Sequence, residues 1–470
     1  MFETGLRQFR MAMAMVWGRR IDPVTVQKLV ADARATLAEF GTPGADVEQL
    51  TDGPFADPEA RQEFSDRSVR RTARRLAELS PFYAERFASA GVDPGRLTMQ
   101  TLRVVPVTTK ADLQARPHEF RCRGVEPVLS TRTTGTTGRP AEVWLSAYEA
   151  ELWPAMAALS GLLRGEIGPE DCMQVNISSR ATAAVQQDVT LCRLVGARSR
   201  VLGVLPPDES LDSLLDRGPT MLATYPSYLA QLVAAARCRG LGPADFALRR
   251  ADVGGEVLSP ALSVAARATH GLQTVNDTFA MTEVLPVSGR SCSLGHLHPD
   301  LNMGLVEVVA LDGSGPAGPG ELGTLVVTPY FPYRDCMPVL RYDTRDVVRT
   351  LVEPPDCELA AIPATSAILG KAGGLYRTAA GVVTPRELVE ALEALPTGPY
   401  PARFRGTVVD GRLHLSVPAR ALDGLDAAAA RQHLADRGLD VELHPVDTDG
   451  RELRTVRADL LETSFTTAKA

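Results

Sequence analysis

Two neighbouring stretches of the chain repeat one pattern, a short apolar run followed by a helix-like segment. In "PTMLATYPSYLAQLVAAARCRG" (219–240) and "ALRRADVGGEVLSPALSVAARATHG" (247–271), the apolar run comes first and apolar residues then recur at helical spacing. Strands that alternate with helices in this way are typical of a parallel sheet. The pattern therefore predicts an α/β fold of mixed sheets and helices, in which the strands are largely parallel.

Changes in composition divide the 470 residues into three parts. Residues 1–60 are predicted to be a helical N-terminal extension, in which "VTVQKLVADARATLAEF" has helical spacing, and a Gly-, Pro- and Asp-rich linker. Residues 61–370 form the predicted large domain, with a more antiparallel section near its end. Residues 371–470 are predicted to be a small α+β domain that contains a hairpin around Asp410 and Gly411.

Overall charge and apolar content exclude several classes of partner. The net charge of -7 and the pI near 5.7 provide no whole-protein attraction to nucleic acid or to an anionic membrane. No run of about 18 apolar residues is present, so no transmembrane helix is expected. The N-terminus does not read as a signal peptide, and the seven cysteines are irregularly spaced. Reduced thiols and a cytoplasmic location are therefore expected.

The stretch "STRTTGTTGRP" (130–140) gathers hydroxyls, glycines and cations in one short loop between two strand-like runs. Glycines permit close backbone approach, backbone N–H groups can point into one concavity, and threonine and arginine side chains add donors. The pattern is not the GxxxxGK[ST] loop of other nucleotide sites. It favours a cradle for phosphate oxygens, and an ordinary solvated loop is the alternative. The cradle residues are Thr133, Thr134, Gly135, Thr136, Thr137, Gly138 and Arg139.

Several motifs in a fixed order carry a resemblance to a known family. "TTGTTGRP" is followed by "GGEVLSP", "NDTFAMTE", "LRYDTRDVVR" and "LGKAGGLYRTAAGVVTPRELVEAL". This order and spacing resemble those of the adenylate-forming superfamily, which includes the acyl-CoA synthetases. "SPFYAERFASAGVDP", "VVPVTTKADL" and "TYPSYLAQL" are similar to its phenylacetate–CoA ligase-like branch. The resemblance covers about residues 65–460, and it implies a large N-terminal adenylating domain and a small mobile C-terminal lid domain.

The resemblance also implies roles for individual residues. When ATP activates a carboxylic acid, the carboxylate attacks the α-phosphorus and pyrophosphate leaves, so the site must stabilise negative charge and exclude water. The cradle would hold the departing phosphates, Glu283 would bring Mg2+ to them, and Thr282 would bond the α-phosphate. Asp346 would accept hydrogen bonds from the ribose. The full set expected at the nucleoside is Gly254, Gly255, Glu256, Asn276, Phe279 and Asp346.

Each of these residues has a plainer alternative. Glu283 alone reads as a surface carboxylate, and Phe279 alone reads as a core residue. Asp346 has the alternative of a structural ion pair, for which the nearby partners in sequence are Arg341, Arg345 and Arg349.

The lysines of this chain are few, and the expected adenylation lysine is missing. Family members carry that lysine near the C-terminus, where this chain has Arg451, and arginine does not present the same point charge. Lys371 stands at the domain hinge, where an arginine is usual. The only other lysines are Lys28, Lys110 and Lys469. Arg451 and Lys371 are the candidate catalytic cations, with Lys469 as a further substitute.

The acid-binding pocket has fewer sequence signals. Family members line it with the region after the phosphate loop and with the segment around "TYPSY". Here the first region is "QVNISSRATAAVQQDV", without the aromatic and glycine-rich residues expected for phenylacetate. Tyr225, Asn176 and Gln186 are the polar candidates, with packing as the alternative for Tyr225. A substrate other than phenylacetate is expected.

A possible metal site involves cysteine and histidine. Some relatives of this branch carry a cluster in the same two regions, which implies structural Zn2+ held by Cys292, His298 and Cys357. His296 or Cys336 would have to be the fourth ligand. The alternative is buried thiols beside a solvated histidine pair.

The resemblance implies an AMP-forming acid–thiol ligase. With ATP and Mg2+ it would convert a carboxylic acid, aryl or unsaturated and of the secondary-metabolite type, to an acyl-AMP and pass it to a thiol of CoA or a carrier protein. One alternative passes the activated group to an amine or performs nitrite-dependent N–N bond chemistry. A second is a catalytically weak nucleotide-binding homologue that acts as a partner or regulator. A homodimer is the expected assembly.

Overall fold

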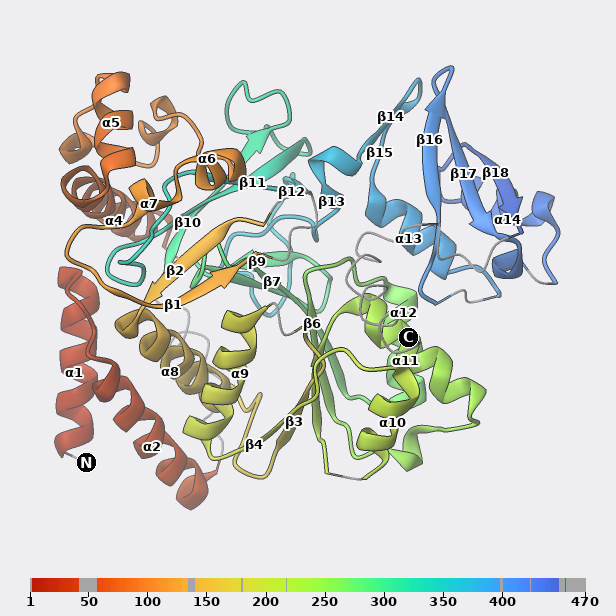
Figure 1. Ribbon diagram of the computed structural model, residues 1–470, viewed down its shortest axis with the longest axis horizontal. Helices are drawn as coiled ribbons and strands as arrows, with labels where there is room; N and C mark the ends of the chain where they lie inside the picture. Colours follow the sequence, from red (N-terminus) through yellow and green to blue (C-terminus); the bar gives the residue numbers. More distant parts are fainter. Residues whose placement is uncertain are drawn as a thin grey trace.

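The computed structural model describes residues 2–41, 57–133, 140–178, 181–216, 218–397, 400–422, 424–447 and 453. Figure 1 shows a broad body that contains the N-terminal helices and the largest sheet, with a small C-terminal unit attached at one corner. Within the described part, no helix is long and apolar enough to span a membrane.

The largest sheet has seven strands in the order β4-β3-β5-β6-β7-β8-β9. Its parallel part consists of β3 (Cys172–Val175), β4 (Arg198–Val201), β5 (Met221–Thr224), β6 (Arg250–Gly254) and β7 (Thr274–Ala280). The edge strands β8 (Ser288–Ser291) and β9 (Leu297–Pro299) run antiparallel. The predicted α/β fold of mixed sheets and helices is confirmed, and the parallel strands expected from the repeated pattern lie in this sheet.

Helices cover both faces of this sheet (Figure 1). On one face lie α8 (Ala147–Leu163) and α9 (Thr182–Val195), and on the other lie α10 (Pro207–Leu215), α11 (Pro226–Cys238) and α12 (Pro260–His270). Strand β6 buries Ala251 and Val253 on the α11–α12 side, where they pack in an apolar cluster with Leu229 and Leu262. Covering both faces removes the apolar strand residues from water, which is why the runs are apolar.

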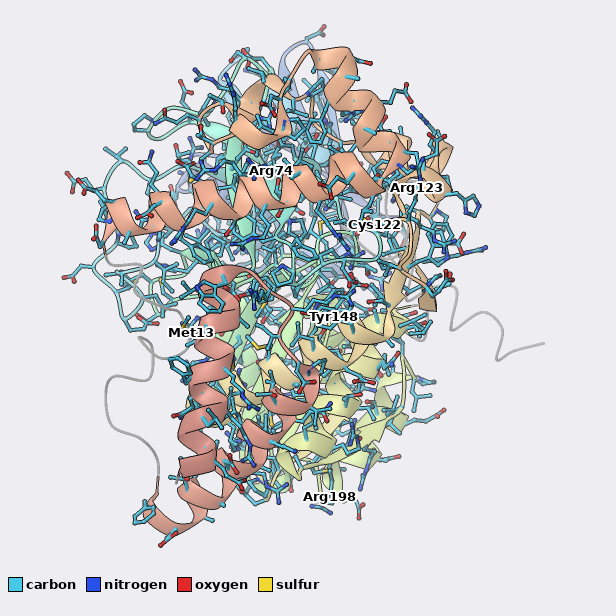
Figure 2. The ribbon with its side chains drawn as sticks, turned by 90° about the vertical axis from the view of Figure 1, so that its left-hand side faces the viewer. Met13, Arg74, Cys122, Arg123, Tyr148 and Arg198 are labelled. Carbon is cyan, nitrogen blue, oxygen red and sulfur yellow. The ribbon has the colours of Figure 1, made fainter. Side chains whose placement is uncertain are left out.

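The N-terminal helices pack on the same body. Helix α2 (Pro23–Phe40) begins where the Asp22 carboxylate accepts hydrogen bonds from two backbone N–H groups and ends at Gly41, as a capped helix should. It lies against α8 and α9, and α1 (Phe2–Trp17) lies against α2. Figure 2 views this side, with Met13 on α1 and Tyr148 on α8. Arg20 pairs with the buried Asp335 and stacks over the Tyr148 ring.

A second, antiparallel sheet follows in the chain. Its strands are β10 (Gly304–Ala310), β11 (Leu322–Pro329), β12 (Tyr342–Arg349) and β13 (Gly370–Lys371). The hairpin of β1 (Pro127–Arg132) and β2 (Glu142–Ser146) lies apart from it. The preceding helices are α4 (Pro58–Leu79), α5 (Pro81–Ala90), α6 (Lys110–Ala115) and α7 (Pro117–Phe120). The antiparallel section expected between 304 and 352 is therefore present.

The C-terminal unit is a small α+β assembly with its own apolar cluster. Its elements are β14 (Tyr376–Thr378), β15 (Gly381–Val383), α13 (Pro385–Glu393), β16 (Arg405–Val409), β17 (Arg412–Pro418), α14 (Ala427–Ala435) and β18 (Val441–Val446). The β16–β17 turn has Asp410 at φ 49° and Gly411 at φ 74°, the left-handed conformations that a two-residue hairpin turn requires. The predicted hairpin is confirmed; residue 371 as the domain boundary stays a prediction.

Candidate active site

The site forms at the carboxyl edge of the parallel strands. Tyr225 follows β5, Gly254 ends β6, and Met281 to Glu283 follow β7. The carboxyl ends of neighbouring parallel strands meet at one edge, so these segments converge although they are distant in sequence. At Gly254 a Cβ atom would lie 2.7 Å from the backbone oxygen of Thr278, and Gly255 has φ +78°. Both glycines are therefore required by the backbone path at this edge.

Glu283 is buried, with 5% of its surface exposed, and accepts a hydrogen bond from the Tyr342 hydroxyl at 3.3 Å. Burial raises the pKa of its carboxyl group, and the positive charges of Lys371 and Lys110 oppose that rise. Glu283 is thus not a surface carboxylate. Its carboxyl group is desolvated and lies in the field of the Lys371 and Lys110 ammonium groups. Buried titratable groups beside specific charges are common at functional sites, so this environment supports a functional role for Glu283.

Asp346 and Lys371 form an ion pair beside Glu283. The Lys371 Nζ atom lies 2.9 Å from Asp346 Oδ2 and donates to the Thr344 backbone oxygen at 3.0 Å. The two residues face each other in the β12–β13 register, so the pairing follows from the sheet itself. The arginines weighed as partners of Asp346 are engaged elsewhere: Arg341 with Glu307, Arg345 with Asp343, and Arg349 with the Gly320 backbone oxygen.

The other expected nucleoside contacts lie nearby but have structural contacts of their own. Phe279 is buried in the main apolar core, and Asn276 donates to Asp252 Oδ1 at 2.7 Å. Glu256 accepts from the Ser227 N–H at 2.8 Å, at the start of α11. Thr282 is half-buried and directly precedes Glu283 in the chain. Their predicted roles at the nucleotide stay predictions.

The predicted phosphate cradle falls mostly outside the described residues. Thr133 is described and buried, and it closes the neck of the loop: its N–H donates to the Ala141 oxygen and its Oγ1 accepts from the Ala141 N–H, both at 3.0 Å. Residues 134–139 lie outside the described part, as do Arg451 and Lys469. The structure therefore confirms a loop between two antiparallel strands and leaves the cradle a prediction.

The three candidate acid contacts are placed differently from one another. Tyr225 is buried, and its hydroxyl accepts from the Ser178 N–H at 3.2 Å. Asn176 is fully buried, and its amide bonds to Gln174, Ser210 and the Gly203 backbone oxygen. Gln186 is exposed on α9. The structure does not bring the three together.

Sequence reasoning missed two charged residues near the site, Lys110 and Asp188. Asp188 on α9 is half-buried and has no hydrogen bond or ion pair within the described residues. Burial and the nearby Asp252 carboxylate raise its pKa to about 7. Lys110 faces Glu283 and Lys371. The scarcity of lysine was a signal for Lys110; Asp188 had none, because its environment depends on how α9 packs on the sheet.

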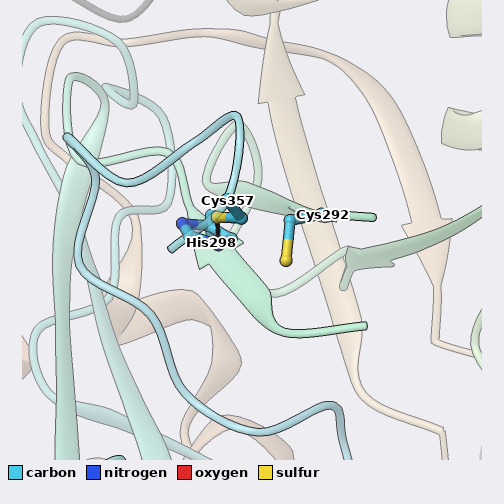
Figure 3. Close-up of side chains that lie close together, drawn as sticks. All are labelled: Cys292, His298 and Cys357. Carbon is cyan, nitrogen blue, oxygen red and sulfur yellow. Dashed lines mark hydrogen bonds between the residues drawn. The ribbon is translucent and has the colours of Figure 1, made fainter. Parts of the chain in front are cut away.

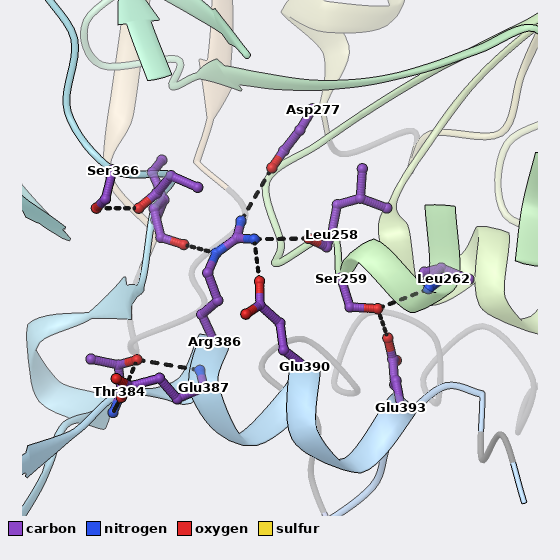
Figure 4. A network of polar contacts seen from close by, with 12 residues as sticks. Leu258, Ser259, Leu262, Asp277, Ser366, Thr384, Arg386, Glu387, Glu390 and Glu393 are labelled. Carbon is purple, nitrogen blue, oxygen red and sulfur yellow. Dashed lines mark hydrogen bonds and ion pairs between the residues drawn. The ribbon is translucent and has the colours of Figure 1, made fainter. Parts of the chain in front are cut away.

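The C-terminal unit is held to the large domain by Arg386, the second residue of α13 (Figure 4). Its Nη2 atom lies 3.2 Å from Asp277 Oδ2, and its Nη1 atom donates to the Leu258 oxygen at 2.9 Å. Beside it, Glu393 of α13 accepts a hydrogen bond from Ser259. These contacts fix one orientation of the small unit over the carboxyl edge of the sheet.

Cys292, His298 and Cys357 converge from the β8–β9 hairpin and the loop after β12 (Figure 3), with ligand atoms all within 4.8 Å of one another. His298 donates through Nδ1 to the Ile362 oxygen at 3.0 Å, which leaves Nε2, 3.5 Å from Cys357 Sγ, for a metal. Two thiols and an oriented imidazole suit Zn2+. His296 Nδ1 lies 3.8 Å from Cys292 Sγ, but His296 is not among the three residues whose ligand atoms all lie within 4.8 Å of one another. Cys336 lies in the main core instead.

Curated relatives of this chain are phenylacetate–coenzyme A ligases. The chain is 25% identical to the Thermus thermophilus protein over 343 residues, which are 70% of this chain and 74% of the relative. It is 27% identical to the Escherichia coli protein over 296 residues, which are 60% of this chain and 65% of the relative, a little under two thirds of its length. No protein-family model matches the chain.

Solved structures with the same fold are CoA ligases. A 2-hydroxyisobutyryl-CoA ligase in the postadenylation state has a TM-score of 0.72 at 18% identity and covers 87% of this chain and 92% of its own. The same ligase in the thioesterification state has a TM-score of 0.59 at 20% identity and covers 88% of this chain and 93% of its own. An anthranilate CoA ligase has a TM-score of 0.51 at 16% identity, covering 73% of this chain and 67% of its own. The chain is therefore a homologue of the phenylacetate–coenzyme A ligases and has the fold of the adenylate-forming CoA ligases.

Proposed function

We propose that this protein is an ATP- and Mg2+-dependent acid–CoA ligase that forms an acyl-AMP and then a CoA thioester. The observation that carries the proposal is the buried Glu283, which faces Lys371 and Lys110 at the carboxyl edge of the sheet, in a chain with this fold. A buried acid group with two cations matches a reaction whose substrates are a triphosphate and a carboxylate, because both bring negative charge that must be stabilised out of water.

The residues around Glu283 fit the nucleotide and its metal. A hard cation such as Mg2+ takes carboxylate and phosphate oxygens, and Glu283 would supply the carboxylate. Mg2+ would neutralise charge on the phosphates. Asp346 would accept hydrogen bonds from the ribose hydroxyls, and Lys371 already holds its carboxylate in place. The loop between β1 and β2 would hold the leaving pyrophosphate.

The acid is proposed to be aryl or unsaturated, and different from phenylacetate. The names of the relatives and of the anthranilate neighbour support an aryl acid. The region 174–189 supports the difference, because it supplies the buried Asn176 and Asp188, which has no hydrogen bond or ion pair among the described residues, where an aromatic, glycine-rich segment is expected. A carrier-protein thiol is a second acceptor to test beside CoA.

The cysteine–histidine cluster is proposed to hold a structural Zn2+. Cys292, His298 and Cys357 would be three of its ligands. The ion would tie the loop after β12 to the β8–β9 hairpin, and its role would be structural.

The decisive experiment measures pyrophosphate release with a panel of aryl and unsaturated acids, with and without CoA. Acid-dependent release together with CoA consumption is expected. Release without use of CoA or a carrier thiol would point to an amine or nitrogen acceptor, and ATP binding without release would point to a regulatory homologue. Glu283→Gln should abolish Mg2+-dependent release while its circular dichroism stays that of the wild type. Full activity in this variant would contradict the assignment of Glu283.

A further inference from the structure

One buried carboxyl group bridges the C-terminal unit and the large domain (Figure 4). Glu393, the last residue of α13, is 4% exposed. Its Oε2 atom accepts a hydrogen bond from the Ser259 hydroxyl, and its Oε1 atom accepts from the Ala402 N–H at 3.1 Å. Ser259 Oγ in turn accepts from the Leu262 N–H at 2.9 Å and caps α12. Glu393 therefore joins the start of a large-domain helix to the end of α13.

Apolar side chains of the two units meet at this junction. Val257, two residues before Ser259, is buried in the apolar cluster of the C-terminal unit, which also contains Leu388 and Leu392 of α13. Packing of this kind excludes water from the surface between the units. A carboxyl group in such surroundings loses hydration, and the loss disfavours its ionised form.

The charges that act on Glu393 are negative. Glu256 and Glu390 both oppose its ionisation, and the Tyr400 hydroxyl lies in its field. Among the described residues no cation pairs with Glu393, and Arg386 Nη1 lies 3.0 Å from Glu390 instead. Burial and the two like charges raise the pKa of Glu393 to about 7, against the effect of its two hydrogen bonds. Helices α12 and α14 and strand β13 also contact α13, and their titratable side chains have other contacts: Arg267, His270, Lys371, Arg431 and His433.

Separation of the two units would bring the Glu393 carboxyl group into water. Its contact on the large-domain side is Ser259, so lifting α13 away removes that hydrogen bond together with the burial. In water its pKa would return toward the ordinary value of 4.5. Because the pKa is higher in the docked arrangement, docking is most favourable below about pH 4.5 and weakens as pH rises to about 7.

We propose that Glu393 and Ser259 form a pH-sensitive latch, which holds the C-terminal unit in the observed orientation in acid and releases it as pH rises through neutrality. Docking takes one proton from water onto the Glu393 carboxylate, and separation returns it. The linkage predicts that the ratio of docked to separated molecules falls about tenfold between pH 6 and pH 8. The latch needs neither nucleotide nor acid substrate, so it goes beyond the proposed ligase activity and does not depend on it.

The test measures energy transfer between fluorophores on the two units of the full chain. The labels are attached through noncanonical residues at Val264 of α12 and Val409 of β16, which are 67% and 50% exposed. In wild type the docked-to-separated ratio should fall about tenfold from pH 6 to pH 8. Glu393→Gln is neutral at both values and keeps the size of the side chain, so its ratio should change by less than about twofold. The matched control Glu442→Gln removes an exposed carboxylate of the same unit and should keep the wild-type response.

A second variant tests the contact with Ser259. Aspartate caps helices about as well as serine, so Ser259→Asp keeps the cap of α12 while it places a second carboxylate against Glu393. This repulsion should lower the docked-to-separated ratio at pH 8 by about tenfold or more, with unchanged circular dichroism. A wild-type ratio that stays constant from pH 6 to pH 8 would overturn the latch. So would a wild-type pH response in Glu393→Gln, loss of docking at both pH values in that variant, or wild-type docking in Ser259→Asp.

Discussion

Arg386 and Asp277 provide the sharpest test of how the small domain works. Asp277→Asn keeps the size of the side chain and removes the charge that faces Arg386 Nη2 at 3.2 Å. A hydrogen bond between charged partners contributes about 1.5–3 kcal/mol, and the 22% exposure of the Asp277 side chain reduces this to about 1–2 kcal/mol. If the pair forms only in the observed orientation, its loss shifts the population away from that orientation by about 5- to 30-fold.

The rates of the two half-reactions measure this shift in the population of domain orientations. The Arg386–Asp277 pair holds the small unit in one orientation, and we expect the two half-reactions to need different orientations, so Asp277→Asn should change the rate of ATP–pyrophosphate exchange relative to thioester formation. Single-turnover transfer from preformed acyl-AMP to CoA measures the second rate. The control is Glu442→Gln, which removes an exposed ion pair with Arg412 inside the small domain. If the ratio of the exchange rate to the transfer rate in Asp277→Asn stayed within about twofold of the wild-type ratio, the proposed role of the Arg386–Asp277 pair would be refuted.

Three further predictions concern stability and metal content. Glu149→Gln leaves the fully buried Arg334, now 3.6 Å from Glu149, without its counter-charge, so denaturant unfolding should show a loss of about 3–5 kcal/mol; an unchanged midpoint would contradict this. The raised pKa of Asp188, about 7, means that the unfolded chain loses this proton above about pH 4 while the folded chain keeps it, so Asp188 opposes folding increasingly as pH rises to about 7. Asp188→Asn should therefore match wild type near pH 4 and exceed it by about 2–4 kcal/mol at pH 8, and equal stability at pH 8 would count against it. Cys292→Ser should reduce bound zinc from about one per chain and lower the Tm, whereas wild-type zinc content would exclude Cys292 as a ligand.

The fold was largely predictable because its signals are local. Apolar period and turn residues identify β5, β6 and their helices, and the Asp410–Gly411 turn identifies the β16–β17 hairpin. Glu283 and Asp346 were assigned to one site from the resemblance to the adenylate-forming superfamily, because neither residue has a local signal of its own. The sequence also predicted that α2 is helical. It did not predict that α2 packs on α8 and α9, because an apolar helix face does not specify its partner.

The remaining parts of the site depend on pairings between distant segments. Lys110 reaches Glu283 only because Thr108 pairs with Tyr342, more than two hundred residues later in the chain. Arg386 meets Asp277 through the orientation of a whole domain. Asp188 acquires its environment from burial on α9 and from the Asp252 carboxylate, which belongs to the distant strand β6. No local period or spacing carries this information, which is why these residues were absent from the sequence-based assignments.

The Asp346–Lys371 ion pair connects two processes that are usually described separately. Asp346 is the proposed ribose acceptor, and Lys371 lies in β13, at the predicted boundary between the two domains. Any nucleotide that competes with Lys371 for the carboxylate also changes the energy of the segment about which the small domain would turn. By reciprocity, the factor by which the nucleotide shifts domain orientation equals the factor by which orientation shifts nucleotide affinity. Through the Asp346 carboxylate, nucleotide binding and rotation of the small domain are thus thermodynamically coupled.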